Sequence, residues 1–198
     1  MKYVPNALTI GRIVVTPVML VLLFSETLLG MAGALVLFIL AAISDYLDGK
    51  IARDYKVRSR FGQFLDPLAD KVLVLGTFVV LAIQVPHLVP WWGVALVAMR
   101  DVAVTGLRSW IESAGRSLRT LPIAKAKTAV QIMFLISMLA LLTGVRIQGS
   151  VGEAATRTLE SWIPLAAFVG VVLFTVTTGV LYFMRQEYAP SHLNNSAQ

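Results

Sequence analysis

The sequence predicts an all-α integral membrane protein whose six transmembrane helices form one bundle in a single domain, residues 1–198. Hydrophobic residues make up 57% of the chain and charged residues only 14%, and the mean hydropathy is +0.77. Several apolar runs approach the ~20 residues that a helix needs to span a bilayer. No internal repeat or low-complexity linker divides the chain.

Six apolar runs place the expected helices, at about 6–24, 28–53, 62–85, 91–114, 122–143 and 161–185. The first begins after Pro5, which suits the first turn of a helix. A cleaved signal peptide is an alternative for this run, since Lys2 and Arg12 precede its apolar part. We favour a retained helix, because only residues 25–27 separate it from the second run, which leads straight into Asp45.

The connections between the later helices differ in character. A basic connection, residues 50–60, precedes the third helix, and a short uncharged link, residues 86–90, precedes the fourth. Another basic stretch leads into the fifth helix near Pro122. The polar stretch 144–161 is expected to connect the fifth and sixth helices, and the tail from Arg185 is expected to fray.

Charged connections predict the orientation of the bundle. The second and fourth connections are rich in Lys and Arg, whereas the first and third contain neither. Because basic loops stay in the cytoplasm, both termini, the end of the second helix and the start of the third are expected on the cytoplasmic side of a bacterial cell membrane. The net charge of +6 is attributed to lipid headgroups and topology, not to nucleic acid.

Four carboxylates flank the second connection, at Asp45, Asp48, Asp66 and Asp70. Residues three or four apart share a helix face, so two antiparallel helices can enclose these acids in one pocket. The chain has no cysteine and only two histidines, which leaves oxygen ligands suited to Mg²⁺, Mn²⁺ or Ca²⁺. Two ions about 4 Å apart could clamp a phosphate during an in-line displacement, and one carboxylate could accept the proton of an attacking hydroxyl.

Small residues lie beside these acids. Gly49, Ala52 and Gly62 leave space where a base or a diphosphate could approach the backbone. Close helix packing is the alternative explanation for each small residue, and pairing with cations such as Arg53 or Lys71 is the alternative for the acids. We favour a functional role, because acids inside a membrane protein are rare and such pairing does not explain four of them on two facing lines.

The motif resembles the signature of the CDP-alcohol phosphotransferase family, and every signature position matches: Asp45, Asp48, Gly49, Ala52, Arg53, Gly62, Asp66 and Asp70. Such enzymes have six membrane helices, use divalent metal, and move a substituted phosphate from a CDP-linked donor to an alcohol with release of CMP. The resemblance implies that Asp45, Asp48 and Asp66 bind metal, expected to be two Mg²⁺ ions with Mn²⁺ as the alternative. It implies that Asp70 is the base and a further metal ligand. The remaining positions would bind the CDP-lipid: Gly49, Ala52, Arg53 and Gly62.

A second charged set bears on the acceptor alcohol. Its basic members could form a pocket for an acceptor that carries its own phosphate: Arg100, Arg108, Lys125 and Lys127. One alternative is that Arg100 and Asp101 form a mutually neutralised buried pair. Another is that the two lysines are ordinary residues of a cytoplasmic loop.

Three stretches, 5–12, 100–108 and 124–131, resemble those of bacterial phosphatidylglycerophosphate synthases, except that Ala124 replaces a glycine and Asp101 a glutamate. The resemblance implies transfer of a phosphatidyl group from CDP-diacylglycerol to sn-glycerol 3-phosphate. It also implies supporting roles for further residues: Asn6, Thr9, Arg12, Asp101, Thr128 and Gln131.

Alternative functions stay open on the sequence alone. The same chemistry could use inositol phosphate, inositol or serine as the acceptor. A divalent-cation transporter is a rival, although it would place acids near mid-membrane on several helices. A structural scaffold gives no reason for the fixed spacing. Small residues such as Gly170 and Gly179 are compatible with a homodimer.

Overall fold

The computed structural model describes the backbone of residues 4–55, 60–113 and 122–184. Within these ranges it describes the side chains except those of residues 4–10, 46–55, 60–70, 108–113, 122–125 and 183. The expected frayed tail from Arg185 therefore lies outside the described residues.

Every secondary-structure element in the described part of the chain is a helix, which confirms the predicted all-α class. Six helices are long and one is short. They are α1 (Val4–Leu22), α2 (Leu28–Tyr55), α3 (Arg60–Gln84), α4 (Trp91–Ser113), α5 (Pro122–Gly144), α6 (Ser150–Glu160) and α7 (Ile163–Met184).

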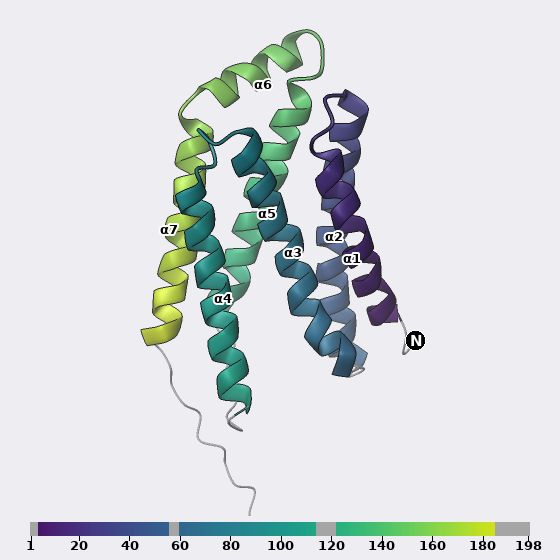
Figure 1. Ribbon diagram of the computed structural model, residues 1–198, viewed down its shortest axis with the longest axis vertical. Coiled ribbons are helices and arrows are strands. Elements are labelled where there is room, and N and C mark those ends of the chain that lie inside the picture. The colour runs from purple at the N-terminus through teal and green to yellow at the C-terminus, as the bar shows by residue number, and fades with distance from the viewer. Residues whose placement is uncertain (1–3, 56–59, 114–121, 185–198) are drawn as a thin grey trace, which may run out of the picture.

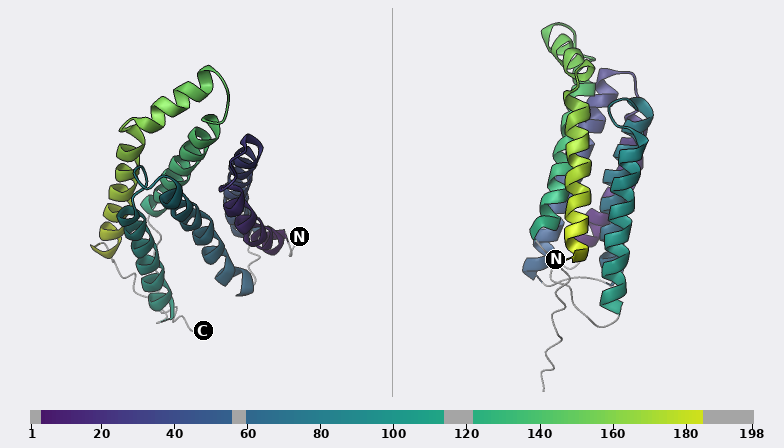
Figure 2. Two further views of the ribbon diagram at one scale, coloured as in Figure 1. Left: turned by 45° about the horizontal axis from the view of Figure 1, so that its top comes forward. Right: turned by 90° about the vertical axis from the view of Figure 1, so that its left-hand side faces the viewer.

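The long helices run side by side, and α6 crosses over one end of the bundle to join α5 to α7 (Figure 1). Helices α3 and α5 lie between two pairs of helices, α1 with α2 and α4 with α7 (Figure 2). Helix α1 packs against both α2 and α3, which contact each other less extensively than either contacts α1. The described chain begins and ends away from α6, so residues 4 and 184 lie at the same end.

Three helices contain stretches long and apolar enough to cross a membrane by length and composition: Leu28–Asp45 in α2, Ala126–Gly144 in α5 and Ile163–Tyr182 in α7. Shorter apolar stretches occupy Gly11–Leu22 in α1 and Lys71–Gln84 in α3. Length and composition therefore support fewer spans among the described residues than the six predicted from the sequence.

Helix α6 corrects the expectation that residues 144–161 are only a connection. The helix starts after Gly149, whose φ of 86° lies in the left-handed region that glycine adopts without steric cost. Its buried positions are the small residues Gly152 and Ala155. A side chain at Gly152 would meet the carbonyl oxygen of Ile147 at 2.0 Å, so the helix packs directly on the chain that precedes it. Such a helix cannot be predicted from apolar runs in the sequence, because its buried face carries almost no large apolar side chains.

An aromatic cluster fills the core in the half of the bundle nearer α6. Phe78 of α3, Phe134 of α5 and Phe168 of α7 have ring centroids 5.7–6.0 Å apart, and Trp92 of α4 meets the edge of Phe168 at 6.4 Å. Gly93 provides the room for Phe168, since a Cβ at Gly93 would lie 2.4 Å from Cε1 of that ring. The cluster thus joins four helices around one well-packed centre.

Gly93→Ala is expected to destabilise the fold by about 1–3 kcal/mol, because the added methyl overpacks the phenylalanine cluster. The measurement is thermal or denaturant unfolding of the protein in detergent. Gly106→Ala is the matched control on the same helix, since a Cβ there meets nothing within 4 Å. If the two variants unfold at the same midpoint, that result would contradict the close packing of Phe168 on Gly93.

Candidate functional site

The first acid of the motif is held by the first helix. Arg12 of α1 donates from Nη1 to Oδ1 of Asp45 on α2 at 2.5 Å. The Arg12 side chain is 1% exposed, whereas that of Asp45 is 35% exposed. Within α1, the hydroxyl of Thr16 donates to the carbonyl oxygen of Arg12. A buried guanidinium therefore fixes a carboxylate that a solute can still reach.

The other motif residues are placed by their backbones. Helix α2 continues through residues 45–55, so Asp45 and Asp48 share one face and Gly49, Ala52 and Arg53 follow in the same helix. Helix α3 carries its three motif residues four apart along one line: Gly62, Asp66 and Asp70. Helix α2 ends and α3 begins at the end of the bundle opposite α6 (Figure 1). The side chains of residues 48–70 lie outside the described ones, so the meeting of the acids stays a prediction.

The third helix is also joined to the fourth beside the motif. Lys71, which follows Asp70 directly, donates from Nζ to the hydroxyl of Thr105 on α4. This contact is partly buried and links residues that are 34 apart in the sequence. It places α4, which carries the proposed acceptor residues, next to the start of the apolar part of α3.

A buried ion pair connects α4 to α5. Nζ of Lys127 lies 2.6 Å and 2.5 Å from the two carboxylate oxygens of Asp101. Both side chains are nearly inaccessible, at 7% and 8% exposed. The described backbones of α4 and α5 do not pack against each other, so this pair bridges them across the interior of the bundle. Removing one partner of such a buried pair typically costs about 3–5 kcal/mol.

Arg100 lies beside this pair, and its contacts with the described residues are long. Its Nη1 is 3.3 Å from Oδ1 of Asp101, and its Nη2 is 3.4 Å from the hydroxyl oxygen of Thr178 on α7. Its Nε is buried and has no hydrogen-bond partner in the part of the chain that the structure describes. The expected alternative of a neutralised Arg100–Asp101 pair is therefore incomplete, because Lys127 takes the closer position on both oxygens of the carboxylate.

Gln131 extends the cluster to α7. Its Nε2 donates to the hydroxyl of Thr175 at 3.2 Å, and Thr178 donates to the carbonyl oxygen of Thr175 at 2.8 Å. Both threonines and Gln131 are buried. We call this set the α4–α5–α7 polar cluster; its members are Arg100, Asp101, Lys127, Gln131, Thr175 and Thr178.

The structure thus brings together part of the predicted acceptor set. Arg100 and Lys127 meet at Asp101, and the predicted supporting residue Gln131 reaches the same cluster through α7. Thr128 is half-buried on α5. The remaining predicted residues have side chains outside the described ones: Arg108, Lys125, Asn6 and Thr9.

The contributions of α7 were missed by the sequence analysis. Thr175 and Thr178 are three apart in an otherwise apolar run, which is a signal that they share a buried face. Gly179, interpreted as part of an exposed dimer face, is instead buried against the stem of Arg100. This part of the dimer argument is therefore wrong, whereas Gly170 is exposed and a Cβ there meets nothing within 4 Å.

Arg100 is the member of the cluster that suits an anion. Its contacts with the described residues are 3.3 Å and 3.4 Å long, and its side chain is only 11% exposed. A buried cation is costly unless an anion or strong hydrogen-bond acceptors approach it. The planar fork of an arginine matches the oxygens of a phosphate, so Arg100 is the side chain best placed to bind one.

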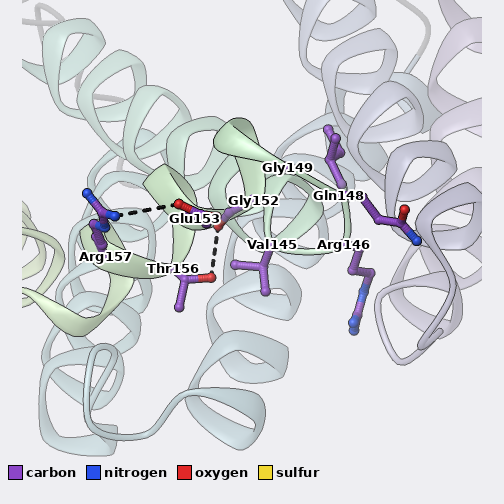
Figure 3. A pocket seen from close by; sticks show the side chains of 9 residues that line it. Val145, Arg146, Gln148, Gly149, Gly152, Glu153, Thr156 and Arg157 are labelled. Carbon is purple, nitrogen blue, oxygen red and sulfur yellow. Dashed lines mark hydrogen bonds and ion pairs between the residues drawn. The ribbon is translucent and has the colours of Figure 1, made fainter.

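A surface hollow of about 500 Å³ lies at the α6 end of the bundle, opposite the motif (Figure 3). It is lined by the connection between α5 and α6 and by the first turns of α6. Two of its three charged residues, Glu153 and Arg157, are exposed and lie 3.5 Å from each other, and the third, Arg146, donates to the carbonyl oxygen of Ser25 at 3.3 Å. Because the hollow lies at the α6 end of the bundle, far from the motif, it lies apart from the candidate site.

Residues 2–183 match the family described as CDP-alcohol phosphatidyltransferase. The chain belongs to this family. It is 36% identical over 185 residues to the CDP-diacylglycerol–glycerol-3-phosphate 3-phosphatidyltransferase of Rickettsia typhi, covering 92% of this chain and 96% of the relative. Proteins of the same name from Rickettsia prowazekii and Cereibacter sphaeroides are 35% and 32% identical, each covering 92% of this chain and 94% of the relative.

The donor chemistry of the motif fits a hard divalent cation. Asp45 offers a reachable carboxylate, and the family motif supplies three more on α2 and α3. Among the side chains that the structure describes, no cluster of three metal-binding groups occurs. The metal site therefore stays a prediction that depends on Asp48, Asp66 and Asp70.

Arg12→Gln is expected to lower phosphatidyltransferase activity by ~10–100-fold, because a hydrogen-bonding partner that orients a metal-binding carboxylate typically contributes that much. Arg12→Lys should recover only part of the loss, since an ammonium lacks the planar fork of a guanidinium. Activity is measured on purified protein in detergent.

Arg146→Gln is the control for this prediction, because Arg146 is exposed and lies at the α6 end of the bundle. Equal activity of Arg12→Gln and Arg146→Gln would contradict a role for Arg12 in positioning Asp45.

Proposed function

We propose that this chain is an integral membrane enzyme that transfers the phosphatidyl group of CDP-diacylglycerol to sn-glycerol 3-phosphate, giving phosphatidylglycerol phosphate and CMP. The observation that carries this proposal is membership of the CDP-alcohol phosphatidyltransferase family across residues 2–183. The relatives named above, whose names state this donor and acceptor, support the choice of substrates. The long contacts of the buried Arg100 in the α4–α5–α7 polar cluster support a phosphorylated acceptor.

The motif residues would bind the donor and the metal. Asp45, Asp48, Asp66 and Asp70 would hold the divalent ions, with Mg²⁺ as the expected metal and two ions as the expected number. When bound, such ions neutralise the diphosphate and make its phosphorus more electrophilic. The small motif residues and the motif arginine would bind the cytidine diphosphate portion: Gly49, Ala52, Arg53 and Gly62.

The chain's own groups would carry the transfer. Asp70 removes the proton from a hydroxyl of glycerol 3-phosphate. The resulting oxygen forms a bond to the phosphatidyl phosphorus while the bond from that phosphorus to the CMP oxygen breaks, and CMP leaves. Arg12 keeps Asp45 in place, as its 2.5 Å contact supports. The acceptor phosphate would lie on the basic set: Arg100, Arg108, Lys125 and Lys127.

We also propose six membrane spans, with both termini and the motif on the cytoplasmic side of a bacterial cell membrane. Six of the described helices have 19–28 residues, a length that can span a hydrocarbon core. The basic connections on either side of α3 and α4 support this orientation. A homodimer is compatible with this arrangement.

The test of the function is CMP release from CDP-diacylglycerol by the purified protein in lipid–detergent micelles. The acceptors are glycerol 3-phosphate, inositol phosphate, inositol and serine, each with and without Mg²⁺. Release is expected only with glycerol 3-phosphate and Mg²⁺. Release with another acceptor would change the substrate, and Mg²⁺ flux into liposomes without any CMP release would favour a transporter.

Asp70→Asn is expected to abolish CMP release while Mg²⁺ binding largely survives, because the amide cannot accept the proton of the acceptor hydroxyl. Single-turnover CMP release and Mg²⁺ titration calorimetry measure the two properties separately. Glu160→Gln, at an exposed position of α6, serves as the control for loss of a carboxylate. Turnover of Asp70→Asn at the wild-type rate would exclude Asp70 as the base.

A further inference from the structure

Gly179 of α7 lies against Arg100 of α4 with no room for a side chain. A Cβ built at Gly179 would lie 2.8 Å from Cγ, 3.1 Å from Nε and 3.5 Å from Cδ of Arg100. These distances place the arginine stem directly on the backbone of α7. The absence of a side chain at residue 179 therefore decides where the guanidinium of Arg100 lies.

Thr178 contacts the other side of the same guanidinium. Its hydroxyl oxygen lies 3.4 Å from Nη2 of Arg100 and itself donates to the carbonyl oxygen of Thr175 at 2.8 Å. The second bond fixes the direction of the Thr178 hydroxyl, so its lone pairs face Arg100. Helix α7 thus positions Arg100 by shape at Gly179 and by a polar contact at Thr178.

Arg100 keeps hydrogen-bonding capacity in this position. A guanidinium has five N–H donors, and the two contacts that Arg100 makes are both at the long limit of a hydrogen bond. Its Nε has no partner among the described residues and lies against Gly179 of α7, so the donors left for a ligand are those on Nη1 and Nη2. Asp101 is shared with Lys127, which lies 2.5 Å and 2.6 Å from its two oxygens, and Arg100 keeps only a longer contact to it.

We infer that α7 forms one wall of the acceptor-phosphate site and that Gly179 and Thr178 are positioning residues for Arg100. This inference rests on the proposed function for the identity of the acceptor. The occupant is a small phosphorylated alcohol, whose phosphate oxygens accept from the donors that Arg100 leaves free. An acceptor without a phosphate offers only neutral oxygens, which form weaker hydrogen bonds with a guanidinium than phosphate oxygens do, so α7 contributes to selectivity for phosphorylated acceptors.

The first test compares Gly179→Ala with Gly170→Ala. Both replacements add one methyl to α7, but a Cβ at Gly170 meets nothing within 4 Å. Gly179→Ala should raise the KM for glycerol 3-phosphate by about tenfold or more, since displacing a binding group by a fraction of an ångström to 1 Å has effects up to ~100-fold. The KM for CDP-diacylglycerol should stay unchanged, and Gly170→Ala should match the wild type in both.

A second pair keeps the inference testable if Gly179→Ala does not fold. Thr178→Val removes the hydroxyl that accepts from Arg100 at nearly constant shape and should raise the same KM, whereas Thr178→Ser should restore it. Thr177→Val is the matched control, because Thr177 is the exposed neighbour of the buried Thr178. Unfolding midpoints without substrate show whether each variant is folded.

A binding measurement separates this inference from the proposed reaction. Inorganic phosphate and glycerol 3-phosphate are expected to raise the thermal unfolding midpoint of the wild type and of Gly170→Ala, and to raise that of Gly179→Ala less. Wild-type protein that is stabilised by phosphate but releases no CMP would contradict the reaction and leave α7 as an anion-site wall. Equal stabilisation of all variants, or equal changes in both KM values, would overturn the role of α7.

Discussion

The ion pair between Lys127 and Asp101 is the interaction on which the arrangement of the second half of the bundle depends. It joins α4 and α5, whose described backbones do not pack together, and it does so where both side chains are almost fully buried. In a low-dielectric interior, separating these charges would leave each without water, so α4 and α5 are held at one spacing. That spacing leaves room for Arg100 and for the polar face of α7.

The fold class could be predicted because long apolar runs and their spacing are local properties of the chain. The motif acids could be assigned to two helix faces for the same reason, since helical periodicity depends only on separation along the sequence. Partner choice is not local. Arg12 pairs with a residue 33 positions away, and Lys127 outcompetes the adjacent Arg100 for Asp101 from 26 positions away. Long side chains contact residues on other helices, and the periodicity of the sequence does not predict which residues they contact.

Small residues were the other limit of prediction. Gly179 is compatible by sequence with a lipid-facing surface, a dimer contact or an internal contact, and only the position of Arg100 distinguishes these. The same holds for α6, whose buried face is made by Gly152 and Ala155 and has no large apolar side chains. Where packing is achieved by the absence of a side chain, hydrophobicity carries little information, and the neighbouring helix must be known.

The short helix α6 has a mechanical consequence for the distant polar cluster. Ser161 ends α6 by donating to the carbonyl oxygen of Thr158 at 2.6 Å, and it accepts from the backbone N–H of Ile163 at the start of α7. One serine therefore couples the two helices, and α7 behaves as a stiff rod that runs from this joint to Gly179, about 24 Å along its axis. Sliding of that rod by one residue would be a shift of about 1.5 Å, enough to move Thr178 away from Arg100. Ser161 thus contributes to the axial register of α7 against Arg100 from the far end of the bundle, through a joint outside the polar cluster.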